Sequence, residues 1–336
     1  MGFTIQKTTH KMPVAHDELW KVSFRTLMPQ FVEFFFPQHY GKIDWNKEIV
    51  FLDKELQTIQ PNSRPKNRIA DVLVMLHRKR GKPLYILLHI EIQGYIDKVF
   101  GLRAHQMRYR IEDKFGINPV MLCVFTDSNP HFHPKEYVVE TWGTGVRTFF
   151  NTYKVMENHP SNYKNPDRIV SLIMETVYYS TQLKGKSDDE IMGLFLPITR
   201  KLITKGYTRK EIEVAYNFIE AYIKFGNNES YLIFEGKIDD MLDYESTPEI
   251  VADFFDTEKK MRRLREAEAI AEKNAERERR EKERERQEKE FSILLLLKQN
   301  MSAEIIAKAL NVPVENILQI QEKYKDNNPI DEILKN

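Results

Sequence analysis

The stretch Tyr85-Ile86-Leu87-Leu88-His89-Ile90-Glu91-Ile92-Gln93 decides the fold of this chain. Its second half alternates apolar and polar side chains, which is the period of a β-strand with two distinct faces. Its first half is apolar, which indicates that other parts of the protein cover both faces. A buried carboxylate is costly unless it has a partner or a metal ion. Glu91 therefore needs a cation or hydrogen-bond donors close to it.

A second apolar stretch, residues 69–76, precedes the first and carries Asp71. The connection between the two contains Gly81 and Pro83, which break regular structure, so we expect a β-hairpin. Asp71 and Glu91 each stand ten residues from Gly81. A hairpin centred on Gly81 makes them cross-strand neighbours, with Cβ atoms roughly 4.5–5.5 Å apart. A register shift of one residue would break this pairing.

Two carboxylates this close repel each other unless a proton or a divalent cation lies between them. Mg²⁺ is commonly held by one or two carboxylates, with water and substrate phosphate completing its coordination. The spacing therefore points to a metal site. The alternative is structural: Asp71 pairs with Arg68, and Glu91 is hydrogen-bonded to the backbone or to His89.

The order of these motifs resembles the PD-(D/E)XK nuclease superfamily, and within it the recombination-promoting nuclease (Rpn) family, whose members are often labelled transposases. Asp71 is followed by a basic turn, the Glu91-Ile92-Gln93 strand, a helix expected over residues 98–114 and a strand expected over residues 120–127. Residues 51–56, 68–73 and 89–93 carry the resemblance, and residues 107–110 add to it.

The resemblance implies an α/β fold, with a restriction-endonuclease-like core of a mixed central sheet flanked by helices, followed by an all-helical C-terminal part. It also implies Mg²⁺-dependent, or Mn²⁺-dependent, hydrolysis of DNA, with Asp71 and Glu91 as metal ligands. Gln93 stands where the superfamily usually has lysine, as in the Rpn group, and would orient the attacking water. Because an amide offers hydrogen bonds but no charge, charge stabilisation would fall more heavily on the metal.

The family's first helix commonly brings a further acidic residue toward the metal. Glu33 is the candidate by its position in the chain, and Glu55, expected in the strand that follows, is its rival. Glu33 has a structural alternative, because it can lie on the solvent face of a helix whose phenylalanines are core.

Basic and polar side chains near these motifs are candidates for contact with DNA phosphates. They are Arg68, Arg78, Lys79, Arg80, Gln106, Tyr109 and Arg110. Two ordinary explanations stay open. Turns are often basic for solubility alone. The helix also carries Arg103 and Arg108, so its basic residues can equally form an ordinary solvent-exposed face.

The amino-acid composition indicates a protein with one hydrophobic core and one highly charged segment. The 336 residues carry a net charge of +1, with 41% hydrophobic and 30% charged side chains. No apolar run approaches the length of a membrane span, and the N-terminal residues lack the apolar stretch of a secretory signal. The single Cys123 cannot form an internal disulfide, so a reducing cytoplasm is the expected location.

Changes in sequence pattern divide the chain into four expected parts. These are a nuclease-like domain (1–160), a helical domain (161–256), a charged helical spacer (257–290) and a small helix-turn-helix-like tail (291–336). Capping-box spacing at Ser187 and at Thr208 predicts helix starts. The spacer has opposite charges four residues apart, such as Glu276 with Arg280, which stabilise a solvated helix. The tail suits either DNA binding or self-association into a homo-oligomer.

Two functions remain in competition. The first is a Mg²⁺-dependent DNA endonuclease, linked by resemblance alone to recombination, mobile elements or defence. The second is a catalytically weak or inactive nuclease fold that acts as a DNA-binding or assembly module. A cut-and-paste transposase in the strict sense ranks third, because the sequence contains no recognisable RNase H-like acidic triad.

Overall fold

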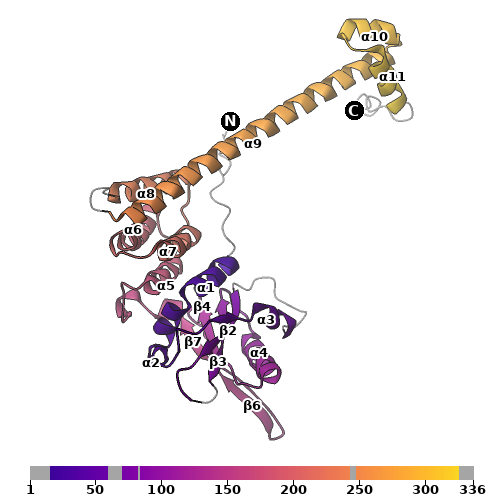
Figure 1. Ribbon diagram of the computed structural model, residues 1–336. Helices are drawn as coiled ribbons and strands as arrows, with labels where there is room; N and C mark the ends of the chain where they lie inside the picture. Colours follow the sequence, from indigo (N-terminus) through magenta and orange to yellow (C-terminus); the bar gives the residue numbers. More distant parts are fainter. Residues whose placement is uncertain (1–15, 60–69, 82–83, 243–246, 325–336) are drawn as a thin grey trace. The chain divides into compact units, whose positions relative to one another are not determined.

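The computed structural model describes residues 16–59, 70–81, 84–242 and 247–324 (Figure 1). Its contacts divide the chain into two compact units, residues 1–261 and 262–336. The first unit combines two sheets with helices, so the expected α/β class is confirmed. The second unit is helical throughout its described residues.

The first unit is built on a five-stranded mixed sheet. Its strands, in spatial order, are β1 (Val50–Phe51), β2 (Ala70–His77), β3 (Tyr85–Gln93), β4 (Val120–Phe125) and β7 (Asn151–Lys154). The first three strands pair antiparallel, and β3, β4 and β7 pair parallel. The sheet is therefore mixed, as expected from the family resemblance.

The β2–β3 hairpin has the register that the spacing around Gly81 predicts. Asp71 lies directly opposite Glu91, and His77 opposite Tyr85. Gly81 has φ of 94°, a backbone conformation that glycine adopts at little steric cost. This register confirms that the two carboxylates are cross-strand neighbours.

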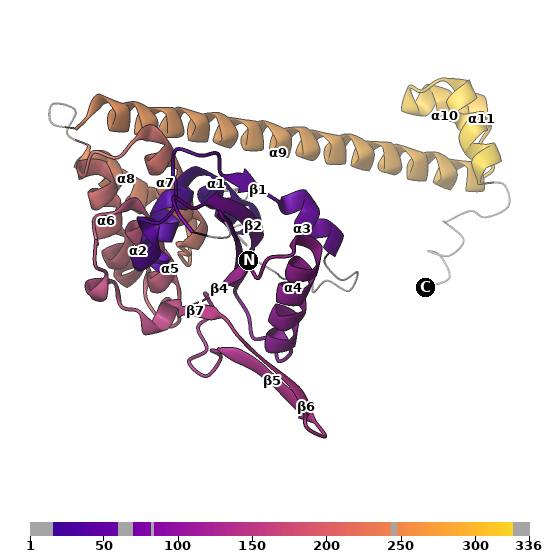
Figure 2. The ribbon, with the colours of Figure 1, turned by 60° about the horizontal axis from the view of Figure 1, so that its bottom comes forward.

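One face of the sheet is covered by α1 (His16–Phe35) and α5 (Ile169–Ser180), with α7 (Arg209–Tyr222) behind them (Figures 1 and 2). Even-numbered strand residues such as Val72 and Ile90 join these helices in one hydrophobic core. In that core the indole N–H of Trp20 donates to the Tyr222 hydroxyl, at 2.8 Å. The helical residues after 160 thus share a core with the sheet.

The opposite face is covered by α3 (Asp53–Ile59) and α4 (Phe100–Phe115). Leu73 of β2 and Leu87 of β3 pack there against Met107 of α4. Since side chains alternate along a strand, the odd-numbered polar residues of β2 and β3 point to this second face. The fold thereby brings the expected site residues of both strands beneath α3 and α4.

The aromatic and β-branched side chains of residues 147–153 predict one strand from sequence alone, but the structure divides this stretch and places its first part in a second sheet. This second sheet is the hairpin of β5 (Glu136–Thr141) and β6 (Thr144–Phe149), labelled in Figure 2. Phe150 separates β6 from β7 because its ring is buried in the core beneath α4. The hairpin turns through Trp142 and Gly143, both with positive φ, as in the tight turns that join twisted strands.

The remaining helices of the first unit follow their sequence signals. They are α2 (Pro37–Tyr40), α6 (Asp188–Thr204) and α8 (Asn228–Met241). Ser187 caps α6 and Thr208 caps α7, each through a complete capping box. Both predicted helix starts are therefore confirmed.

The second unit contains the later part of α9 (Glu249–Lys298), α10 (Ala303–Leu310) and α11 (Val314–Lys323). Ile293, Ile306 and Ile317 form its small core. The Arg280 guanidinium lies 2.5 Å from Glu276, as the charge pattern predicts. Across the described residues, no helix has the length and apolar character needed to cross a membrane.

Candidate active site

Asp71 and Glu91 form a cross-strand carboxylate pair in which Glu91 is buried and Asp71 is slightly exposed. Their side chains are 11% and 3% exposed. His89 on the same face of β3 is fully buried, with Nε2 3.9 Å from Asp71 Oδ1. Two carboxylates on neighbouring strands repel each other, so a positive charge close to them stabilises the pair.

Arg103, in the first turn of α4, supplies that positive charge. Its Nη2 donates to Glu91 Oε1 at 3.0 Å and to Gln93 Oε1 at 3.3 Å. Its Nε lies 2.7 Å from Asp97 Oδ2. Burial by itself would lower the pKa of Arg103, but Glu91 and Asp97 outweigh burial and raise that pKa above its ordinary value. The guanidinium is therefore a permanent cation in this site.

Sequence reasoning placed Arg103 only on a basic helix face, so its role in the site was missed. A signal was present in the chain. Only residues 94–99 separate the end of β3 from the start of α4, so the first helical turn has to return close to Gln93. A long arginine in that turn can reach the polar face of the strand.

Gln93 is fully buried, and both ends of its amide are engaged. Its Oε1 accepts from Arg103, and its Nε2 donates to the carbonyl oxygen of Tyr95 at 2.6 Å. These bonds fix the orientation of the amide. In this arrangement Gln93 holds Arg103 in place.

Cys123 lies behind the carboxylates, paired with Glu91 across the β3–β4 ladder. Its thiol is completely buried. Burial first, and then the charges of Glu91 and Asp71, raise the thiol pKa well above its ordinary value. The thiol is therefore neutral and serves as a small core side chain.

The donor set fits a hard divalent cation only in part. No group of three or more His, Cys, Asp or Glu side chains is placed to hold a metal ion within the part of the chain that the structure describes. The site offers two carboxylates. Proteins usually bind Mg²⁺ through one or two carboxylates, and water and substrate phosphate provide the other ligands. Glu91 also carries the hydrogen bond from Arg103, so a metal would share this carboxylate with the guanidinium.

Neither candidate for a third acidic ligand joins the pair. Glu33 belongs to α1, on the opposite face of the sheet, with Oε1 3.6 Å from Arg168 Nη2. Glu55 lies in α3 and not in a strand, because β1 ends at Phe51 and a helix begins at Asp53. The acidic first turn of α3 suits a helix N-terminus, which explains why this expectation was wrong.

The basic turn lies at the far end of the hairpin from the carboxylates. Arg78 is seven residues along from Asp71, which is about 23 Å at the rise of a β-strand. Lys79 and Arg80 follow it and are exposed. These side chains can therefore contact only phosphates several nucleotides away from one held at Glu91. Arg68 lies outside the described residues.

The α4 candidates divide between two sides of the helix. Arg103, Gln106 and Arg110 stand at i, i+3 and i+7 and so share one side. Arg110 donates to the carbonyl oxygen of Ile59, at 3.3 Å, so its guanidinium is partly committed to α3. Tyr109 points elsewhere and is 58% exposed.

Comparisons of this chain with protein-family models, with curated proteins and with solved structures found no match. The function is therefore inferred from the side chains that the fold brings together. Those side chains are the carboxylates of Asp71 and Glu91, the guanidinium of Arg103, and Gln93 and Asp97, which hold that guanidinium.

Proposed function

We propose that this protein is a Mg²⁺-dependent deoxyribonuclease that hydrolyses phosphodiester bonds, with Asp71, Glu91 and Arg103 at its active site. One observation carries the proposal: a cross-strand carboxylate pair with a guanidinium 3.0 Å from one of its members. The hairpin, the helix and the parallel strand β4 follow one another as in the PD-(D/E)XK nucleases that the sequence resembles. Mn²⁺ is the natural substitute, because it also prefers oxygen ligands.

Asp71 and Glu91 are the two protein ligands in this proposal. When bound there, Mg²⁺ polarises the phosphate and lowers the pKa of an attacking water. Asp71 and Glu91 would hold the ion, and water and phosphate oxygens would supply its remaining ligands.

Arg103 supplies the charge that lysine supplies elsewhere in the superfamily. Its Nη1 is buried and has no hydrogen-bond partner among the described residues, so this N–H group is the one left to donate to a phosphate oxygen. Arginine does not lose its proton at physiological pH. Arg103 therefore acts by stabilising negative charge in the transition state, and Gln93 and Asp97 position it.

Plasmid cleavage tests the proposal directly. Wild type, Asp71→Ala and Glu91→Ala are incubated with supercoiled plasmid in Mg²⁺ and in Mn²⁺. Asp113→Ala is a matched control, because Asp113 is an exposed carboxylate on α4. We expect nicked or linear DNA with wild type and the control, and none with the two site variants. Cleavage that survives both site substitutions would overturn the assignment.

The second candidate is a nuclease fold that binds DNA without cutting it. The contacts of Arg103 favour this DNA-binding function, because its guanidinium already donates hydrogen bonds to Glu91 and to the Gln93 amide oxygen. A metal then competes with an established ion pair. Binding of labelled duplex DNA with no cleavage in either Mg²⁺ or Mn²⁺ would select this function over the first. Roles in recombination, mobile elements or defence rest on the resemblance alone.

A further inference from the structure

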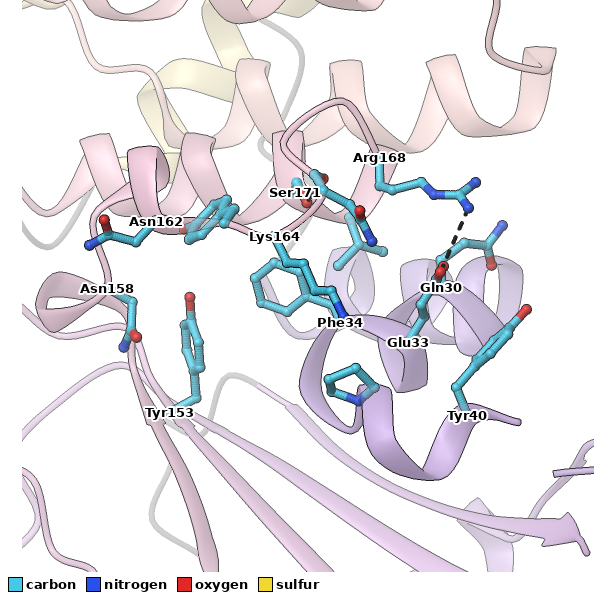
Figure 3. A pocket seen from close by; sticks show the side chains of 14 residues that line it. Gln30, Glu33, Phe34, Tyr40, Tyr153, Asn158, Asn162, Lys164, Arg168 and Ser171 are labelled. Carbon is cyan, nitrogen blue, oxygen red and sulfur yellow. Dashed lines mark hydrogen bonds and ion pairs between the residues drawn. The ribbon is translucent and has the colours of Figure 1, made fainter. Parts of the chain in front are cut away.

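A cavity of about 320 Å³ lies on the other face of the sheet from the carboxylate pair (Figure 3). It is enclosed by the end of α1, by β7 and by the segment that leads into α5. Gln30, Phe34, Tyr153, Tyr163, Lys164 and Arg168 are the lining residues that matter here. Its volume suits a small molecule and is too small for a polymer.

Three polar atoms in the wall of this cavity are incompletely hydrogen-bonded. The amide oxygen of Gln30 is buried without a hydrogen-bond partner among the described residues. The hydroxyls of Tyr153 and Tyr163 interact with each other and have no other hydrogen-bond partner among those residues. Burial raises the pKa of Tyr153 to about 12 and raises that of Tyr163 further, so both phenols stay protonated. Buried polar groups are nearly always hydrogen-bonded in folded proteins. One unpartnered amide oxygen beside two hydroxyls that have only each other points to a ligand that completes their hydrogen bonds.

The rim of the cavity is positively charged. Lys164 and Arg168 both line it and both are exposed. Arg168 pairs with Glu33 at 3.6 Å, drawn as the dashed line in Figure 3. This is a long ion pair, and the Arg168 side chain is 63% exposed, so the guanidinium can turn to an incoming anion. The rim therefore selects a ligand with an anionic group at one end.

The walls of the cavity are aromatic. The Phe34 ring packs edge-on against Tyr153 and Tyr163, with centroids 5.7 and 5.3 Å away. Tyr40 and Pro37 extend this apolar wall. Flat apolar surfaces with a few polar atoms between them suit a planar heterocycle that carries its own N–H and carbonyl groups.

We propose that this cavity binds a nucleoside monophosphate, with the base against the aromatic wall and the phosphate at Lys164 and Arg168. An N–H group of the base donates to the Gln30 amide oxygen, and the two phenols bond to its remaining polar edge. Glu33 opposes binding, because it repels the phosphate and competes for Arg168. This site is independent of the nuclease proposal and shares none of its residues.

Isothermal titration of the full-length chain tests the proposal. The probes are AMP, GMP, CMP and UMP, with adenosine and inorganic phosphate as separate arms. We expect at least one monophosphate to bind with a submillimolar Kd. Losing the charged contact in Arg168→Ala should weaken it roughly 10- to 100-fold, and losing one hydroxyl in Tyr163→Phe about 3- to 10-fold. Lys210→Ala, an exposed lysine of α7 away from the cavity, should bind like wild type.

Glu33→Gln gives the sharper test, because it should tighten binding severalfold, and a damaged fold cannot produce a gain. The proposal is overturned if none of the four monophosphates binds. It is also overturned if inorganic phosphate binds as tightly as they do, or if Glu33→Gln weakens binding. Circular dichroism of each variant verifies that the fold is kept.

Discussion

Arg103 contacts side chains from two different segments, Glu91 and Gln93 on β3 and Asp97 in the loop that follows. The planar guanidinium presents donors in fixed directions, so one residue can serve three acceptors at once. A lysine ammonium carries the same charge but cannot reproduce this fork. The residue is therefore a sensitive probe of the site.

Substituting Arg103 should lower two kinetic quantities, each for a different reason. In Arg103→Ala we expect kcat for DNA cleavage to fall about 10²–10³-fold, the range for loss of one oxyanion-stabilising donor. The Mg²⁺ concentration for half-maximal rate should fall as well, because Glu91 loses its competitor. Arg103→Lys should lie between. Initial rates of plasmid nicking across a Mg²⁺ titration give both values, and an unchanged Mg²⁺ dependence would contradict the shared-carboxylate arrangement.

Cys123 should report on unfolding. Its burial and its raised pKa keep the thiol neutral and inaccessible, whereas the thiolate is the reactive species. In native buffer at pH 8 we expect no labelling by a disulfide reagent, and one thiol should react in denaturant. Rapid labelling of the native protein would show that the β3–β4 region opens.

At the scale of residues, the sequence predicted the pairing that follows from residue spacing, and it missed the contact that depends on how a helix packs on the sheet. Asp71 and Glu91 could be paired because both are equally distant from Gly81 and a hairpin preserves that symmetry. The contact of Arg103 depends on the angle at which α4 leaves the sheet. No periodicity of the sequence encodes that angle.

Capping boxes allow a quantitative prediction at the scale of single helices. The Ser187 hydroxyl accepts from the Glu190 backbone N–H, and the Glu190 carboxylate accepts from the Ser187 N–H. Ser187→Ala should lower the free energy of unfolding by about 1 kcal/mol, the usual cost of a lost N-cap. Ser187→Asn, which can still cap, should stay close to wild type. Urea denaturation measures both, and equal loss in the two variants would show that the cap is not the cause.

The same contacts affect the pKa of the Glu190 carboxyl group. Hydrogen bonds from Ser187 lower the pKa of Glu190 in the folded state. A carboxyl group with a lowered folded pKa contributes stability above its unfolded pKa, near 4.5, and this contribution is lost as pH falls through the folded value. The difference in unfolding midpoint between wild type and Glu190→Gln should therefore shrink as the buffer pH is lowered from 7 toward 3.

Element boundaries were predicted well where local signals set them and poorly where tertiary contacts did. The capped starts of α6 and α7 came from side chains within four residues. The split between β6 and β7 depends on Phe150 entering a core formed by α4 and β4. Residues 147–153 are rich in aromatic and β-branched side chains on both sides of Phe150, so the local sequence does not indicate that break.

At the scale of the whole molecule, the two compact units should lose structure separately. Ile306 is fully buried in the small core of the second unit. Ile306→Ala should destabilise that unit by about 2–5 kcal/mol and leave the sheet untouched. Hydrogen exchange read by mass spectrometry should then show faster exchange in α10 and α11 and unchanged exchange in β3. Faster exchange in both places would mean that the units unfold together.

The strands of the hairpin and the helical remainder were predictable from local signals, because strand alternation and helix caps are encoded within a few residues. The mixed pairing of the sheet was expected from the family resemblance alone. The sequence did not predict that helices α5 to α8 share a hydrophobic core with the sheet. The sequence separated residues 161–256 as a helical domain on a change of pattern. Contacts such as the Trp20–Tyr222 hydrogen bond join positions 202 residues apart, and no local pattern records them.

Trp142, at the tip of the β5–β6 hairpin, is completely exposed, whereas Trp20 is completely buried. An exposed indole emits at longer wavelength and is quenched by iodide, and a buried one is shielded from both effects. Trp142 is therefore an intrinsic fluorescence probe of the hairpin tip. Any molecule that covers the tip should shift the iodide-sensitive part of the emission to shorter wavelength, and Trp142→Phe should abolish that change.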